Sequence, residues 1–385
     1  MSGVAAADFV AARALFPATR RLAYLMNAAV SPIPTPVLEA IGRHLEEVSL
    51  EGCPDWNRWL AVIQRCKNRL ARLLGVDAAD LAFTKNTSQG LQLAAASIPW
   101  RPGDNIVSND MEFPANVFPW KMLEPTRGVQ VRTVASAGGR VTADALVEAM
   151  DGRTRAVAVS WVQFSNGFRC DLERLSEACE RRGCWLVVDG VQGVGALELD
   201  VRRLGGRTMV AGGCHKWLLC PPGLGYFHCP RSHYGELSPA GWGWLSMRDP
   251  FRMGHEPRLR DDGGRFEEGN ANVAAIHGLD AALELLERLG MSRVEARVLE
   301  LAGRAMEEAR KLGCEVLTPC GPAERSGIVL VRHPAIGAGE LVSGLARRGV
   351  MVVERDGAVR VSPHFYNDES DIERFAAGLR EMGAR

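Results

Sequence analysis

The sequence predicts an α/β protein with a large, mainly parallel sheet and a smaller α+β unit at its C-terminal end. Short apolar runs alternate with amphipathic stretches between about Leu81 and Phe227, and this pattern gives way to a polar, Gly-rich stretch after about Met253. The runs are continuous rather than alternating, which is typical of parallel strands that helices cover on both faces. With 385 residues, 46% of them hydrophobic, the chain can bury a large core.

The predicted strands of the large sheet follow one another along the chain. They are "DLAFT", "DNIVSN", "VQVRTVAS", "TRAVAVSW", "CWLVVD", "RTMVAGG" and "GLGYF". Helical patterns such as "DLERLSEACERRG" separate some of them. Sheets of this kind bind ligands at the carboxyl ends of their strands, so residues directly after an apolar run are candidates for function.

The C-terminal part begins with a polar, Gly-rich stretch, "HEPRLRDDGGRFEEGNAN". A helix is expected from about Val273 to Leu289, then a second one over "MSRVEARVLELAGRAMEEARKLG". Short strands are expected near "SGIVLVRH", "GVMVVE" and "AVRVS". We therefore predict a large unit over residues 30–255 and a small unit over residues 256–385, which the N-terminal residues 1–29 complete.

Charge and cysteine content narrow the functional classes. The 46 basic and 46 acidic residues cancel, which gives no reason to expect nucleic acid or a membrane surface as a partner. The N-terminus lacks the pattern of a signal peptide, so we expect a cytoplasmic protein. Ten scattered cysteines without a CxxC pair indicate reduced thiols, and with no HExxH motif a metal is not expected.

Two residues at strand ends are candidates for chemistry. Asp189 ends the run "CWLVVD", and Lys216 lies in "AGGCHKWLLCPPGLGYF". Taken alone, most lysines in Gly/Pro-rich turns are solvated surface charges, and the aspartate is a turn cap as readily as a functional group. The 27 positions between them leave room for one helix and one strand, and a right-handed crossover would bring both to one crevice. A lysine for a Schiff base and a carboxylate for the pyridine nitrogen are what pyridoxal phosphate needs.

A phosphate site is also predicted. In "LAFTKNTSQGLQLAAAS" a strand gives way to a helix that starts near Ser88. Backbone N–H groups at the helix N-terminus, with the hydroxyls of Thr87 and Ser88, would form an anion site. An ordinary helix N-cap has the same sequence pattern, so this stretch supports a phosphate site only in combination with Asp189 and Lys216.

Six motifs in this order resemble the class V aminotransferase family. They are "NTSQG", "DMEFPAN", "VVDGVQ", "CHKW", "RFEEGNAN" and "VRVSPHFYN", and the similarity runs from "YLMNAAVSPIP" to the last helix. The family belongs to the fold-type I pyridoxal phosphate enzymes. It includes cysteine desulfurases, selenocysteine lyases, kynureninases and isopenicillin N epimerase-like proteins. The resemblance implies that this protein has the fold-type I architecture and uses pyridoxal 5'-phosphate as its cofactor.

The resemblance also implies roles for single residues. Lys216 is the Schiff-base lysine and Asp189 the partner of the pyridinium nitrogen. Gln192 would bind the phenolic oxygen of the cofactor, and His215 would reach toward the phosphate. The remaining residues are Phe113, stacked on the pyridine ring, Gln163, near an asparagine that touches the phenolic oxygen, Asn270, at the neighbouring subunit's phosphate, and Arg360, on the substrate carboxylate. We therefore expect a homodimer with a shared active site.

Three departures from the family pattern bear on the reaction. Gly213 replaces the serine found in cysteine desulfurases, and Asn270 follows Gly269 in place of threonine. The loop "MVVERDGA" has no cysteine where many desulfurases carry their nucleophile, and the nearest upstream thiol, Cys320, is expected to be incidental.

The resemblance implies an enzyme that acts on a small amino acid through an external aldimine and a Cα carbanion. Because elimination needs no sulfur nucleophile, we favour a lyase-type β-elimination at a C–S bond, with epimerase or aminotransferase action as the alternative. A non-catalytic scaffold would not need Lys216, Asp189 and Arg360 together, and a nicotinamide dehydrogenase would need a GxGxxG motif that the chain lacks. The substrate itself stays open.

Overall fold

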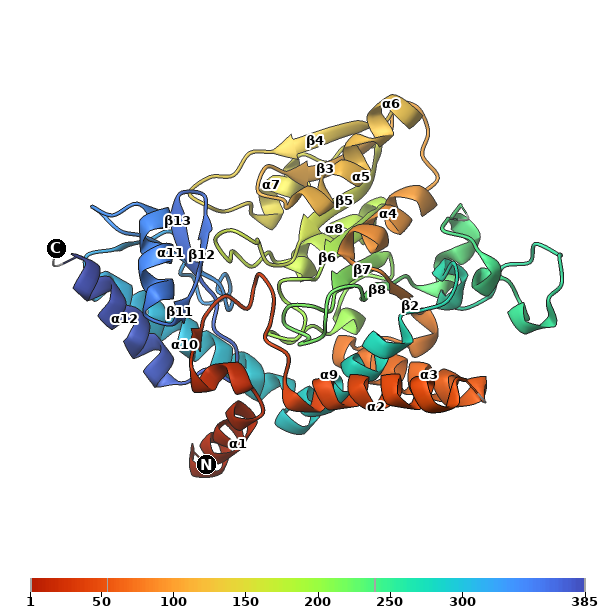
Figure 1. Cartoon of the computed structure of the whole chain (residues 1–385). Helices are drawn as coiled ribbons and strands as arrows, with labels where there is room; N and C mark the ends of the chain where they lie inside the picture. The colour runs from red at the N-terminus through yellow and green to blue at the C-terminus, as the bar shows by residue number, and fades with distance from the viewer. Residues whose placement is uncertain (1, 54, 239, 384–385) are drawn as a thin grey trace.

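A computed structural model describes residues 2–53, 55–238 and 240–383. In this part of the chain, seven strands form a large sheet in the order β2-β8-β7-β6-β5-β3-β4 (Figure 1). Their bounds are β2 Leu81–Thr84, β3 Asn105–Asn109, β4 Gln130–Val134, β5 Thr154–Ser160, β6 Trp185–Asp189, β7 Thr208–Gly213 and β8 Gly225–His228. Strands β3 to β7 run parallel, whereas β8 is antiparallel to both β2 and β7. The predicted, mainly parallel sheet is confirmed.

Helices cover both faces of this sheet, which explains why its strands are apolar throughout. Alternate residues of β6 belong to two different core clusters: Leu186 and Val188 pack with α7, α8, α9 and α3, whereas Val187 packs with α4, α5 and α6. The bounds of these helices are α3 Trp56–Leu74, α4 Thr87–Ser97, α5 Phe118–Lys121, α6 Leu123–Arg127, α7 Ala143–Glu148, α8 Leu172–Arg182 and α9 Val273–Leu289. A strand buried on both faces leaves no solvent side for polar residues.

A second, antiparallel sheet lies in the C-terminal unit, in the order β12-β13-β10-β9. Its strands are β9 Glu315–Val316, β10 Val329–Arg332, β12 Val353–Arg355 and β13 Ala358–Val361. The helices of this unit are α10 Met291–Lys311, α11 Ala338–Arg347 and α12 Glu369–Gly383. They pack on one face of the sheet through a separate apolar core. The expected α+β character is confirmed.

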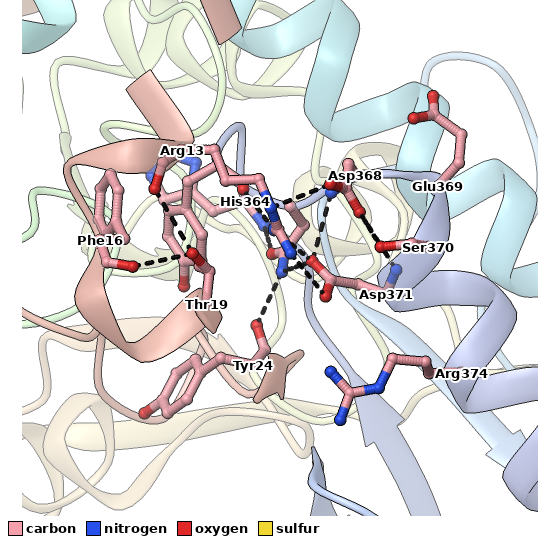
Figure 2. A network of polar contacts seen from close by, with 12 residues as sticks. Arg13, Phe16, Thr19, Tyr24, His364, Asp368, Glu369, Ser370, Asp371 and Arg374 are labelled. Carbon is pink, nitrogen blue, oxygen red and sulfur yellow. Dashed lines mark hydrogen bonds and ion pairs between the residues drawn. The ribbon is translucent and has the colours of Figure 1, made fainter. Parts of the chain in front are cut away.

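The N-terminal segment is fastened to the C-terminal unit. Helix α1 (Ser2–Ala14) ends beside α12, and β1 (Ala23–Tyr24) pairs in parallel with β11 (Val350–Met351). The guanidinium of Arg13 donates to both carboxylate oxygens of Asp371, at 2.6 and 3.1 Å, and lies 2.9 Å from Asp368 (Figure 2). Asp371 is fully buried, so this contact joins the two ends of the chain through an ion pair shielded from water.

Helix α9 follows the polar stretch predicted to open the small unit, but it packs against α2 (Thr35–Glu51) and α3 of the large one. The three helices run side by side beneath the large sheet (Figure 1). The division at residues 255 and 256 stays a prediction.

The connection from β6 to β7 differs from the expectation. Instead of a helix, residues 190–207 contain one turn of 3-10 helix, Val201–Arg203. Gly195, with a φ of 97°, does not adopt helical backbone angles, and Gly193 packs directly on Trp161, because a Cβ there would lie 2.2 Å from the ring. The two strands are nevertheless adjacent and parallel, so the predicted meeting of their carboxyl ends does not depend on that helix.

Among the described residues, no helix combines the length and apolarity needed to cross a membrane. The ten cysteines are free thiols. In the same part of the chain, no group of three or more His, Cys, Asp or Glu side chains is placed to hold a metal ion. The cytoplasmic location stays a prediction.

Candidate active site

Lys216 and Asp189 lie at the carboxyl edge of adjacent strands. Asp189 is the last residue of β6, and Lys216 follows β7 by three positions. The ammonium nitrogen of Lys216 lies 5.9 Å from the ring centroid of Phe113, which comes from the loop after β3. Three residues that lie far apart in the sequence therefore surround one space.

Asp189 is a buried carboxyl group with mixed electrostatic surroundings. Burial raises its pKa to about 7; a hydrogen bond from the Val191 amide opposes this change, Glu112 adds to it, and Lys216 opposes it. Its Oδ1 atom accepts the Val191 N–H at 2.9 Å. A carboxylate so poorly solvated gains from a cationic partner, as a protonated pyridine nitrogen would be.

The Lys216 amine is held in a form that loses its proton readily. Burial lowers its pKa to about 8; Asp189 raises the pKa, whereas Arg360 and Arg355 lower it further. A buried lysine with a depressed pKa is a better nucleophile near neutral pH than an ordinary one. The surroundings therefore suit the attack of this amine on an aldehyde.

At the predicted phosphate site, helix α4 approaches β7. Helix α4 begins at Thr87, one residue before the expected start, and Asn86 caps it by accepting the Gln89 N–H. Gly90 permits the close approach, because a Cβ there would lie 2.8 Å from Ala211 in β7. The first N–H groups of a helix have no partner within the helix and point toward such an anion site.

Gly213 leaves a small space between two of the predicted phosphate ligands. A Cβ at this position would lie 3.0 Å from the Thr87 hydroxyl and 3.1 Å from the His215 ring. Burial lowers the pKa of His215 to about 4, and Lys216 acts in the same direction. His215 is therefore neutral near pH 7 and offers one N–H to an anion. The structure brings Thr87, Gly213 and His215 together.

Ser88 is exposed at the rim of this site. It lines a groove of about 900 Å³ together with Phe113, Phe118 and Met122. Phe113 itself is 45% exposed and packs edge-on against Phe164, with ring centroids 5.2 Å apart. One face of the Phe113 ring thus remains open for contact with a flat ligand.

Gln163 is held in an orientation that the sequence did not indicate. Its Nε2 atom donates to Glu112 at 3.0 Å and to Asn109 at 3.4 Å, while its buried Oε1 atom has no partner among the described residues. Because both N–H groups are used, Gln163 presents a hydrogen-bond acceptor. It therefore differs from an amide that donates to a phenolate, and its contact with the cofactor stays a prediction.

Glu112 is a residue that our sequence reasoning missed. Its buried carboxylate accepts hydrogen bonds from the side chains of Asn109, Asn116, Ser160 and Gln163. The signal was available in "DMEFPAN", where an acidic residue directly precedes Phe113 after a buried strand. Glu112 fixes the wall behind Phe113 and contributes the second negative charge near Asp189.

Gln192 is positioned from two sides. It donates to the Ala28 carbonyl at 3.0 Å and accepts the indole N–H of Trp217, also at 3.0 Å. One hydrogen of its amide nitrogen remains for another acceptor. His364, a second residue missed from the sequence, contacts the Trp217 carbonyl at 3.1 Å and so supports the turn that carries Lys216.

Arg360 is almost completely buried, with 1% of its surface exposed. One of its terminal nitrogens donates to the Phe164 carbonyl at 2.5 Å, whereas its Nε and Nη2 atoms have no partner among the described residues. Burial lowers its pKa to about 9, and Arg355 acts in the same direction. Unused guanidinium donors in a buried position match the two oxygens of a carboxylate.

Two further residues lie apart from this cluster. Asn270 is exposed in the loop before α9, and no contact of the described residues joins it to Lys216. Cys320 is exposed and lies 2.8 Å from the guanidinium of Arg310, at a pocket of about 730 Å³ that Phe164 also lines. A role for Asn270 at a neighbouring subunit stays a prediction.

The residues present fit pyridoxal phosphate. The N-terminus of α4, Thr87 and His215 offer donors around the space beside Gly213, and Asp189 offers a buried carboxylate. Lys216 carries an amine of lowered pKa next to the open ring of Phe113. Phosphate, pyridine nitrogen and aldehyde each find complementary chemistry in one place.

Comparison with known proteins gives the family. The model of the family described as "Aminotransferase class-V" matches residues 23–375. This chain belongs to the class V aminotransferase family. It is 27% identical to a probable cysteine desulfurase of Methanothermobacter thermautotrophicus, over 95% of this chain and 96% of that protein. It is 33% identical to the isopenicillin N epimerase of Amycolatopsis lactamdurans, over 82% and 84%.

Solved structures agree with the fold. The apo cysteine desulfurase of Thermococcus onnurineus NA1 has a TM-score of 0.87 at 25% identity, and the comparison covers 96% of each chain. The cystine C–S lyase C-DES, in complex with cysteine persulfide, has a TM-score of 0.88 at 23% identity, over 94% of this chain and 98% of C-DES. A mutant of C-DES has glycine linked covalently to its PLP cofactor. The fold is therefore that of the fold-type I class V enzymes, a pyridoxal phosphate-dependent family.

Proposed function

We propose that this protein is a pyridoxal phosphate-dependent enzyme that carries out β-elimination on a small amino acid, in the manner of a C–S lyase. The observation that carries the proposal is the convergence of Lys216, Asp189 and Arg360 on one space. Lys216 has a lowered pKa, Asp189 is buried, and Arg360 has donors without a partner among the described residues. A scaffold protein would gain nothing from three poorly solvated ionisable groups.

Each residue has a distinct task in this proposal. Thr87 and His215, with the α4 N-terminus, bind the phosphate, and Asp189 keeps the pyridine nitrogen protonated. Arg360 binds the α-carboxylate of the substrate through its free Nε and Nη2 donors. Lys216 binds the cofactor and, once released, accepts the α-proton. The cofactor, when bound, withdraws electrons from Cα.

The overall reaction is balanced without any further nucleophile. A cysteine S-conjugate and water give a thiol, pyruvate and ammonia. Lys216 accepts the proton from Cα, and the C–S bond breaks with its electron pair on sulfur, so that a thiolate leaves. Gln192 accepts a hydrogen bond from Trp217, the residue after Lys216, and so holds the Lys216 turn in place during the proton transfer.

The cysteine content favours elimination over direct sulfur attack. No cysteine lies between Val352 and Arg360, and Cys320 lies on the segment before β10 with Arg310 as its neighbour. Cys320→Ser therefore should leave elimination at the level of the unmodified protein. A large loss in this variant would instead indicate desulfurase chemistry.

The sequence comparison favours epimerase action as the alternative function. The isopenicillin N epimerase of Amycolatopsis lactamdurans has the higher identity, 33% over 82% of this chain, compared with 27% over 95% for the probable desulfurase of Methanothermobacter thermautotrophicus. Epimerisation returns the proton to Cα from the other face. Aminotransferase action would instead need a keto acid as acceptor.

We further propose a homodimer with a shared active site. Phe118 and Met122, 64% and 58% exposed, flank the groove that Phe113 and Ser88 line. Burial of such apolar side chains against a second copy would favour association. Asn270, exposed here, would then reach the partner's phosphate site. Light scattering tests this: a fully active monomer would contradict it.

The cofactor assignment is tested by reconstitution. Purified protein with added pyridoxal phosphate should gain visible absorbance, and Lys216→Ala should lose both this band and turnover. Lys311→Ala, on the exposed end of α10, is the matched control and should keep both. A wild-type-like band in Lys216→Ala would refute the Schiff-base role.

The reaction type is tested with cysteine conjugates. Incubation with the loaded enzyme should release pyruvate and ammonia in equal amounts. If the enzyme instead exchanges an α-deuterium and returns both enantiomers, epimerisation is the function. A strict need for a keto acid would identify an aminotransferase.

A further inference from the structure

A second arginine, Arg355, shares a face of the small sheet with Arg360. Strands β12 and β13 pair in antiparallel fashion, with Val353 opposite Arg360 and Arg355 opposite Ala358. Because side chains alternate along a strand, these four residues project to the same side. Asp356 and Gly357, with φ values of 50° and 69°, form the tight turn that joins the strands and sets this register.

This face points toward the large unit. The opposite face carries Val359 and Val361, which belong to the apolar core formed with Leu341 and Leu345 of α11. Arg360 reaches the Phe164 carbonyl, in the loop after β5, from the near face. Arg355, two positions along the same face and half-buried, is therefore directed to the same side of the active site.

Neither guanidinium has a carboxylate partner within the described residues. The Nη1 atom of Arg355 donates to the Glu354 carbonyl at 2.7 Å, a backbone group without formal charge. Two other half-buried arginines do have such partners: Arg13 binds Asp371, and Arg297 binds Glu369. Two neighbouring guanidinium groups without a counterion repel each other, so the arrangement gains stability from an added anion.

The electrostatic influence of Arg355 extends to the reacting groups. Its charge lowers the pKa of Arg360 and that of Lys216, in each case after the larger effect of burial. Charges influence one another in this way over short distances, because salt and water screen longer ones. Arg355 therefore acts on the same space as Arg360 and Lys216.

We propose that Arg355 binds a second anionic group, so that the substrate is an amino acid with a negative charge on its side chain or leaving group. The inference rests on the proposed function, in which Arg360 takes the α-carboxylate and the α4 N-terminus takes the phosphate. Arg355 is then the cation left for another group. Its place beside the hairpin turn suits the distal end of the substrate.

The test uses two probes that differ only in distal charge: S-(2-carboxyethyl)-L-cysteine and its side-chain amide. Binding to the holoenzyme is followed by the change in cofactor absorbance, which does not require turnover. The wild-type protein should bind the acid at least tenfold more tightly than the amide. In Arg355→Gln this ratio should fall below twofold, and Arg355→Lys should keep an intermediate ratio.

Arg347→Gln, an exposed arginine of α11, is the matched control and should keep the wild-type ratio. Equal affinities of the wild type for the acid and the amide, or an unchanged affinity ratio in Arg355→Gln, would refute the inference. A normal cofactor band in the same samples would leave the proposed function standing. Failure of the band to form on adding pyridoxal phosphate would refute the proposed function and this inference with it.

Discussion

The pKa of the Lys216 amine can be tested in the protein without cofactor. Burial lowers it from the ordinary 10.5 to about 8, which corresponds to about 3 kcal/mol against the ammonium form. At pH 7 about one amine in ten is then neutral, compared with about one in three thousand for an ordinary lysine. Counting the neutral fraction alone, Lys216 should therefore react with an electrophile on the order of 300-fold faster than an ordinary amine of equal accessibility and equal intrinsic nucleophilicity.

Competitive labelling with trace acetic anhydride, from pH 6 to 11, measures this directly. Peptide mass spectrometry quantifies the product at Lys216 against Nα-acetyl-lysine in the same tube. We expect half-maximal reactivity near pH 8, as the lowered pKa implies. Asp189→Asn should move the midpoint lower, because Asp189 favours the ammonium form, and Arg360→Gln should move it higher. A midpoint near 10.5, or a rise in Asp189→Asn, would refute the electrostatic account.

Three further predictions concern the framework around the site. Gly90→Ala should push α4 away from β7 and so weaken pyridoxal phosphate binding at least tenfold in a fluorescence titration. The control is Gly42→Ala in α2, which should leave binding intact because nothing lies within 4 Å of the added Cβ. Arg13→Met leaves the buried Asp371 without its cation and should cost about 3 kcal/mol of unfolding free energy in urea; an unchanged midpoint would show that the pair contributes nothing. Burial lowers the pKa of His228 to about 4, so the free energy of unfolding falls as the pH drops from 6.5 toward 4. Between pH 7.5 and 5, His228→Leu should lose about 2 kcal/mol less unfolding free energy than the wild type. Equal losses in the two proteins would contradict this.

The large sheet could be predicted from the sequence because burial on both faces leaves a local signal. All five residues of β6 are buried, so its apolar run is continuous and ends at Asp189. The same rule located Lys216, which follows β7, and Thr87, which follows β2 by three positions. Where a strand ends, the chain reaches the functional edge of the sheet, and one-dimensional patterns are sufficient to find it.

Other features depend on contacts that no local pattern contains. The amide of Gln163 is oriented by Glu112 and Asn109, from another strand-to-loop junction. The proposed role of Arg355 depends on the register of β12 with β13, because this register places Arg355 on the same face as Arg360. The helix expected between β6 and β7 is absent from the described chain, where turns and one turn of 3-10 helix form the connection and Gly193 packs on the Trp161 ring. Each of these is a tertiary fact that propensity and spacing cannot supply.

In the proposed function, in which Arg360 binds the substrate carboxylate, substrate binding is linked to the packing of the two units. Its side chain starts in β13 and reaches the Phe164 carbonyl of the large unit, yet two of its donors remain without a partner in the described part of the chain. A buried donor that lacks a partner costs about 1–3 kcal/mol. A carboxylate that accepts from these donors removes this cost only while β13 stays against the large unit. For the proposed role of Arg360 we therefore expect substrate binding to stabilise the contact between the units, and by the same linkage we expect a looser contact to weaken substrate binding.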